Sequence, residues 1–213
     1  MGFIQLSIMS DLQKYLDASA ARHSHLCPRQ ILGVRAALFA VKKLNLGLPR
    51  LDKRLLIISE TDGCFVDGLE VVTGATVGHR TLRIEDLGKI AATFVDVKQN
   101  ISIRVAPRQD LRDLAWQYAP GEKRHYFAQL KAYQQMPGEE MFVIQQVELN
   151  APVEQIISRA GIRSECDICG EEIINGREVF VHGSYLCRTC AGPSYYTAIE
   201  HRPFQAEQIE KAD

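Results

Sequence analysis

Four cysteines in the last third of the chain are arranged as a metal-ligand set. Cys166 and Cys169 form one Cys-x2-Cys pair, Cys187 and Cys190 form a second, and 17 residues separate the pairs. Each pair presents two thiolates from one tight turn, and this spacing is typical of zinc sites. Four thiolates leave no coordination position for water or substrate, so we predict one structural zinc per chain. A redox dithiol would need only one pair and a thioredoxin-like context, which this segment lacks.

The residues around the pairs fit a small zinc finger. Gly170 follows the second cysteine, where a turn that wraps around a metal often needs a residue without a side chain. Residues 178–181 and 184–186 flank a turn at His182-Gly183, so a hairpin can carry the second pair back to the first. His182 is interpreted as a turn residue and not as a ligand. We expect a domain of treble-clef or zinc-ribbon type over residues 164–195, followed by a tail over 196–213.

A second set of possible ligands lies near the amino terminus. His25 and Cys27 precede Pro28, which suits the first turn of a helix, where the positive end of the backbone dipole lowers the pKa of a thiol. Cys64 follows a turn at Asp62-Gly63, at the end of an apolar run of strand length. His25, Cys27 and Cys64 are therefore a candidate core metal site. On spacing alone, the alternative is a buried structural cysteine and a surface histidine.

Three segments of the chain carry a family resemblance. HSHLCPRQILGVRAALFA at 23–40, TDGCFVDGLEVVTGATVGH at 61–79 and DLGKIAATF at 86–94 resemble the E-subunit family of formylmethanofuran dehydrogenase. That family carries a His-x-Cys-Pro-Gly segment, an Asp-x-Cys segment and a Thr-Gly-Cys-Thr-x-Gly-Lys segment, and some members append a cysteine zinc finger. The resemblance spans residues 20–105, and residues 106–160 carry no part of it.

The resemblance implies roles for particular residues. It marks His25, Cys27 and Cys64 as metal or active-site positions, and it places Asp62, Asp67 and Thr73 in the lining of the site. The chain departs from the family pattern at Ala75 and His79, where cysteine and lysine are common, and at Arg29, where glycine is usual. The core site is therefore expected to bind a different metal, to use His79 as a replacement ligand, or to be empty.

The remaining pattern predicts an α+β fold, with a core domain over residues 1–160. Strands and helices are interspersed without a βαβ rhythm or a phosphate-binding glycine loop. One helix, from Pro28 to Leu44, should keep Arg35, Lys42 and Lys43 exposed. The other helices are predicted at 11–22, 65–72, 110–118, 122–135 and 152–160, and the strands at 54–60, 81–84, 90–97, 101–105 and 141–149.

Composition and charge narrow the classes of function. With 46% hydrophobic and 24% charged residues, the chain is typical of a soluble globular protein. Its apolar runs, such as 55–58, are far shorter than the roughly 20 residues of a membrane span. The amino terminus lacks a basic secretion signal, so a cytoplasmic protein is expected. Residues 164–213 carry 4 Lys and Arg against 9 Asp and Glu, which disfavours nucleic-acid binding by the finger.

These observations support three hypotheses of function. The first is a metal-binding protein whose zinc finger mediates self-association or docking to another protein, with a possible second transition metal in the core; the resemblance implies a homodimer. The second is an enzyme or accessory subunit linked to formylmethanofuran dehydrogenase-type one-carbon metabolism, in which two thiolates and one imidazole leave a metal position open for substrate. The chain shows no motif for molybdopterin or an iron–sulfur cluster, so it is not the catalytic subunit alone. The third is a nucleic-acid-binding regulator.

Overall fold

The computed structural model describes residues 12–48, 52–157 and 161–197, which belong to two compact units. The core unit extends to Ile157 and the carboxy-terminal unit begins at Ser158. The predicted domain bounds of 1–160, 164–195 and 196–213 remain proposals, because most of the predicted tail lies outside the described residues. None of the described helices is both long and apolar enough to cross a membrane.

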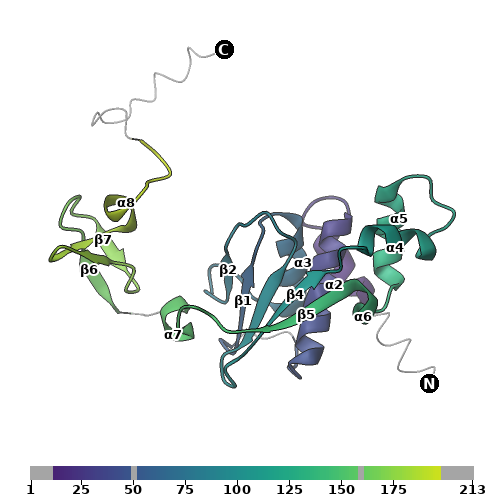
Figure 1. Cartoon of the computed structure of the whole chain (residues 1–213), viewed down its shortest axis with the longest axis horizontal. Helices are drawn as coiled ribbons and strands as arrows, with labels where there is room; N and C mark the ends of the chain where they lie inside the picture. Colours follow the sequence, from purple (N-terminus) through teal and green to yellow (C-terminus); the bar gives the residue numbers. More distant parts are fainter. Residues whose placement is uncertain (1–11, 49–51, 158–160, 198–213) are drawn as a thin grey trace, which may run out of the picture. The chain divides into compact units, whose positions relative to one another are not determined.

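A mixed five-stranded sheet forms the centre of the core unit (Figure 1). Its strand order is β2-β1-β3-β4-β5, in which β1 and β2 are parallel and the other neighbours are antiparallel. The β3–β4 hairpin pairs Ala92 with Val105 and Asp96 with Ile101. The strands are β1 (Leu55–Ser59), β2 (Leu82–Ile84), β3 (Ala92–Asp96), β4 (Ile101–Pro107) and β5 (Phe142–Val147).

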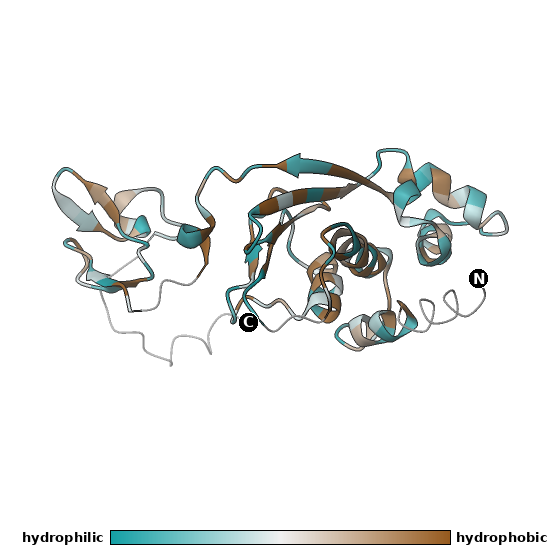
Figure 2. Cartoon of the chain, turned by 90° about the horizontal axis from the view of Figure 1, so that it is seen from below, coloured by the Kyte–Doolittle hydropathy of each residue, from teal (hydrophilic) through white to brown (hydrophobic). Residues whose placement is uncertain are grey.

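Helices pack against one face of this sheet, and their apolar residues face it (Figure 2). Ile57 and Phe94 of the sheet join Ile31 and Leu69 of the helices in one fully buried core. On the opposite face, Leu56 packs in a smaller cluster with Val95 and Val153, so β1 is buried on both sides. The helices are α2 (Pro28–Lys43), α3 (Cys64–Thr73), α4 (Leu111–Tyr118), α5 (His125–Gln135), α6 (Gly138–Met141) and α7 (Val153–Ile156), and residues 12–20 are also helical.

The predicted α+β class is confirmed, and several details of the core unit differ from the expectations. The helix predicted over 122–135 begins only at His125, and the short helix α6 was not predicted. Arg35 was expected to be exposed, but it donates hydrogen bonds to the carbonyl oxygens of Gln134, at 3.4 Å, and of Met136. Residue 11 and residues 158–160, which were assigned to helices, lie outside the described residues.

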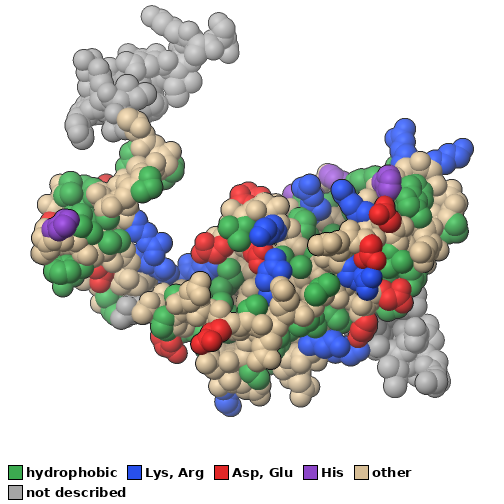
Figure 3. All heavy atoms as spheres, in the orientation of Figure 1, with side chains coloured by type: hydrophobic (Ala, Val, Ile, Leu, Met, Phe, Trp, Pro, Cys, Tyr) green, Lys and Arg blue, Asp and Glu red, His purple; other side chains and the backbone are tan. Residues whose placement is uncertain are grey.

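The carboxy-terminal unit is built from two short hairpins and one helical turn. The hairpins are β6 (Arg163–Glu165) with β7 (Glu172–Ile174), and β8 (Val179–Val181) with β9 (Ser184–Leu186); α8 (Arg188–Ala191) follows. Cys166, Ile173 and Leu186 form its small buried core. Hydrophobic side chains also lie at its surface (Figure 3), among them Phe180 and Tyr185.

Candidate metal centre and core pocket

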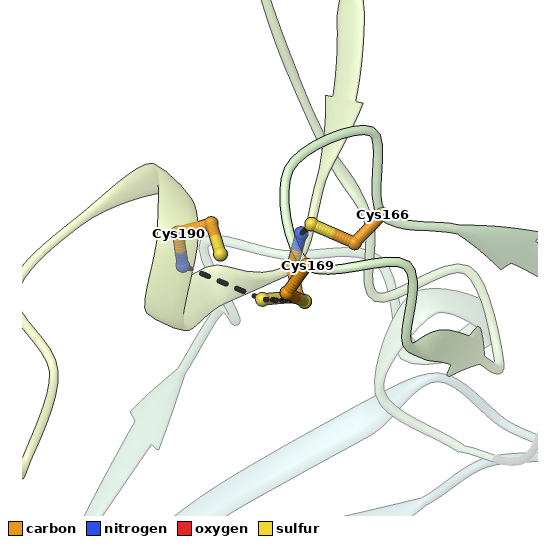
Figure 4. A group of neighbouring side chains, drawn as sticks. Cys166, Cys169 and Cys190 are labelled. Carbon is orange, nitrogen blue, oxygen red and sulfur yellow. Dashed lines mark hydrogen bonds between the residues drawn. The ribbon is translucent and has the colours of Figure 1, made fainter. Parts of the chain in front are cut away.

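The four carboxy-terminal cysteines converge on one point (Figure 4). Their sulfur atoms all lie within 4.8 Å of one another, and the Sγ atoms of Cys169 and Cys187 are 3.9 Å apart. Four thiolates bonded to one zinc at about 2.3 Å in a tetrahedron would be roughly 3.8 Å apart. The geometry and the donor set therefore fit one metal ion held by four thiolates.

The backbone around the cysteines holds them in place. Gly170 has a φ of 72° and donates its N–H to the carbonyl oxygen of Cys166 at 2.9 Å, so the first pair is closed by a left-handed turn that favours glycine. Cys187 is the N-cap of α8, and its sulfur accepts a hydrogen bond from the N–H of Cys190. The N–H of Cys187 in turn donates to the sulfur of Cys166. The order of turn, hairpin and helix matches the treble-clef alternative.

These N–H groups prepare the site for a cation. The backbone N–H groups of Cys169 and Cys187 lower the pKa of the Cys166 thiol to about 6. By contrast, the hydrogen bond with the sulfur of Cys187 raises the pKa of Cys190 to about 12. These N–H groups thus favour the thiolate form of Cys166, and a thiolate is the form of cysteine that binds a metal ion.

Cys27 and Cys64 are brought together in the core unit. Cys27 is the N-cap of α2, Cys64 is the first residue of α3, and both side chains are half-buried. Both side chains line the same cavity. Burial raises the pKa of the Cys64 thiol, and the neighbouring Cys27 raises it further. The sequence therefore predicted two residues that do meet, although they are separated by 36 positions.

The histidines predicted for this site do not join the two cysteines. His25 is exposed in the loop before α2, and His79 is exposed in the loop after α3. Among the described residues, only the four carboxy-terminal cysteines form a group of three or more ligands close enough to share one metal ion. Of the predicted core ligands, Cys27 and Cys64 line one cavity, and His25 is not among the residues that line it.

The residues expected to line the core site have other partners or positions. Asp67 pairs with His23, and Arg22 lies beside the same carboxylate at 3.6 Å. Thr73 is buried and donates a hydrogen bond from its hydroxyl to the carbonyl oxygen of Leu69. Asp62 is exposed.

The two thiols open into a cavity of about 710 Å³ that the sequence did not predict. Arg29 lines it from the start of α2, next to Cys27, and other lining residues come from the segment that runs from the end of β4 through α4 and α5. That segment contributes Arg108, Arg112, Tyr126 and Tyr133. Burial raises the pKa of Tyr133 to about 12, so this phenol is neutral over the physiological range. These residues fall in the segment 106–160, where the resemblance gave no guide.

Comparison with known protein families gives a match to FmdE, described as "FmdE, Molybdenum formylmethanofuran dehydrogenase operon". The match covers residues 22–143, which is more than half of the chain and includes all of the α2 and α3 segments. This match confirms the family resemblance that residues 23–40, 61–79 and 86–94 carry.

Two individual proteins are similar to the chain over most of its length. A curated protein of Archaeoglobus fulgidus, described as a probable S-adenosyl-L-methionine-binding protein, is 29% identical over 92% of the chain, and the chain spans 57% of that protein's length. The crystal structure of a tungsten formylmethanofuran dehydrogenase FmdE-like protein from Syntrophus aciditrophicus matches with a TM-score of 0.55. That match has 20% identity and covers 87% of this chain and 95% of the other. At this identity the match supports the shared fold alone.

Proposed function

Because the chain belongs to the FmdE family, we propose that it is a two-site metal-binding protein linked to formylmethanofuran dehydrogenase-type metabolism. In this proposal the carboxy-terminal unit holds one structural zinc, and the core presents Cys27 and Cys64 to a transition metal. The observation that carries the proposal is the convergence of four sulfur atoms within 4.8 Å. A site with four thiolates is closed to substrate, so this zinc contributes folding free energy and no catalysis.

The core pair supports a different kind of metal site. Two thiolates favour zinc or another late transition metal over magnesium or calcium. Cys27 and Cys64 supply two ligands, so the remaining positions of a bound metal would be filled by solvent or by a molecule in the cavity. Such an open site permits Lewis-acid chemistry. The proposal for the core therefore rests on the two thiols. His25, which the sequence analysis named as a third candidate ligand, is not part of this pair.

Self-association through the carboxy-terminal unit is the second part of the proposal. Phe180 and Tyr185 occupy facing positions of the β8–β9 hairpin, and their ring centroids are 5.0 Å apart. Both side chains are at least half exposed, as is Ile168 in the turn of the first cysteine pair. Aromatic side chains exposed side by side are common at protein interfaces, which supports a homodimer or a protein partner.

Two other functions have less support. The Archaeoglobus relative suggests binding of S-adenosyl-L-methionine, but the cavity carries three arginines, and these would repel the sulfonium and ammonium groups of that molecule. Nucleic-acid binding by the finger is disfavoured by the excess of five negative charges over residues 164–213. An accessory role beside a catalytic subunit is compatible with the proposed metal sites.

Elemental analysis of three purified proteins tests the two metal sites. We expect one zinc per chain in the parent, and a second metal equivalent that is lost in the Cys27→Ser, Cys64→Ser double variant. The double variant should keep its zinc, whereas Cys169→Ala should lose it and keep the core metal. A parent without zinc would contradict the structural site, and equal metal content in the parent and the double variant would contradict the core site.

A further inference from the structure

We propose that the core cavity binds a small organic anion with at least two negative charges, such as a dicarboxylate or a phosphate ester, beside Cys27 and Cys64. This inference concerns the same cavity as the proposed core metal and rests on that cavity being functional. It does not need the metal, because the residues that would hold the anion are arginines. Two independent features of the cavity carry it: its uncompensated charge and the helices that begin at its wall.

The charge of the cavity is strongly one-sided. Arg29, Arg108 and Arg112 line it, and none of the described lining residues is acidic. Arg108 is paired with Asp110 through two hydrogen bonds of 2.9 and 2.8 Å. Neither Arg29 nor Arg112 forms a salt bridge with any other described residue. Two guanidinium groups are therefore available to a ligand, and guanidinium forks bind carboxylate and phosphate groups in a bidentate manner.

Three helices begin at the same cavity. Cys27 and Pro28 start α2, Cys64 starts α3 and Leu111 starts α4, and all four residues line the cavity wall. These helices contain 16, 10 and 8 residues. The amino-terminal end of a helix carries a partial positive charge and favours anions. The three helix ends thus reinforce the field of the arginines.

The rest of the wall suits the body of an organic molecule. Leu32, Ile90 and Leu111 are apolar, and Tyr126 offers an aromatic ring. The phenolic hydroxyl of Tyr126 reaches the carbonyl oxygen of Leu26 at 3.5 Å. A volume of about 710 Å³ is in the usual range for small-molecule sites. A ligand would fit this cavity if its charged groups bound the arginines and its apolar or planar part packed against the apolar and aromatic side chains.

Calorimetric titration with isophthalate, a flat dianion, tests the proposal. The neutral diamide of the same shape, isophthalamide, serves as the reference ligand. We expect saturable binding of isophthalate that weakens with added salt, and much weaker binding of isophthalamide. Arg29→Gln and Arg112→Gln should each weaken isophthalate binding by about tenfold or more, because each removes a charge-assisted hydrogen bond.

Matched variants separate this proposal from the core metal. Lys53→Gln removes one exposed positive charge outside the cavity and should bind isophthalate as the parent does. Dialysis of the parent against a metal chelator should remove any core metal and leave isophthalate binding unchanged, because the arginines and not a metal hold the anion. Absence of saturable isophthalate binding by the parent, or equal affinity of the parent and both arginine variants, would overturn the proposal. Equal affinity for isophthalate and its diamide would overturn it as well.

Discussion

Gly33 of α2 and Gly68 of α3 lie against each other so closely that neither position has room for a methyl group. A Cβ atom on Gly33 would lie 2.1 Å from the carbonyl oxygen of Phe65, and one on Gly68 would lie 2.5 Å from the backbone of Gln30 and Val34. The contact is four to six residues from the start of each helix. The close crossing therefore brings the first turns of α2 and α3, and with them the two core thiols, to the same place.

Substitution of Gly68 by alanine should destabilise the core unit. Alanine is the better helix former by about 1 kcal/mol, but the clash is with backbone atoms, which cannot rotate away, and overpacking typically costs about 1–3 kcal/mol. We expect a lower midpoint of urea unfolding. Gly121→Ala is the control, because nothing lies within 4 Å of a Cβ atom there. Equal stability of the two variants would show that the helices can separate freely.

The buried carboxylate of Asp96 should make the core sensitive to acid. Arg54 donates two hydrogen bonds to it, at 3.0 and 2.7 Å, and the N–H groups of Lys98 and Gln99 donate two more. The hydrogen bonds from Arg54 hold the pKa of Asp96 below its usual value. The folded state therefore binds fewer protons than the unfolded state below a pH of about 4, and stability is lost as the pH falls through that range.

Asp96→Asn should thus cost about 1–3 kcal/mol at neutral pH, since it removes the charge from the hydrogen bonds that Arg54 donates. The variant should also lose less stability than the parent on acidification. Urea unfolding at several pH values measures both effects. Asp110→Asn breaks a similar pairing with Arg108, but that pair is exposed and is expected to contribute little. If both variants behave alike, the burial of Asp96 has no energetic role.

The four-cysteine cluster could be predicted from the sequence because its members come in two local pairs. Each Cys-x2-Cys turn fixes two ligands within four residues, and the hairpin between the pairs has its own turn signal at His182-Gly183. The three-residue strands β6 and β7 were not predicted, because such short strands leave no periodic pattern. The turn between them brings them together, because Gly170 donates its N–H to the carbonyl oxygen of Cys166 and Cys166 donates its N–H to that of Glu171.

The core pocket could be predicted only in part. Its two thiols lie in segments with a recognisable family pattern. Arg108 and Arg112 lie about 80 residues after Cys27 in the sequence, and they line the same cavity because they follow strand β4 of the central sheet. No local sequence pattern predicts that these arginines and the two thiols line one cavity. The partners of Arg35 were missed for the same reason, since its hydrogen bonds depend on how α5 packs against α2.

Replacement of Phe180 by serine should weaken self-association. The side chain is 63% exposed and stacks beside Tyr185 on the β8–β9 hairpin, so it contributes little to the buried core of its own unit. We expect the variant to shift from dimer toward monomer in light scattering coupled to size-exclusion chromatography. Arg163→Gln, at a charged residue of the same unit whose side chain is 66% exposed, should leave the dimer intact. A parent that is monomeric at all concentrations would refute the proposed homodimer.

Loss of one zinc ligand should unfold the carboxy-terminal unit and spare the core. The buried core of that unit consists of Cys166, Ile173 and Leu186, and so small a core depends on its metal for stability. Cys169→Ala should therefore become sensitive to protease over residues 161–197, while the unfolding of the core unit stays unchanged. Cys64→Ser serves as the control, because it removes a thiol from the other unit. Equal protease resistance of Cys169→Ala and the parent would show that the unit folds without its metal, so that the four thiolates would need another role.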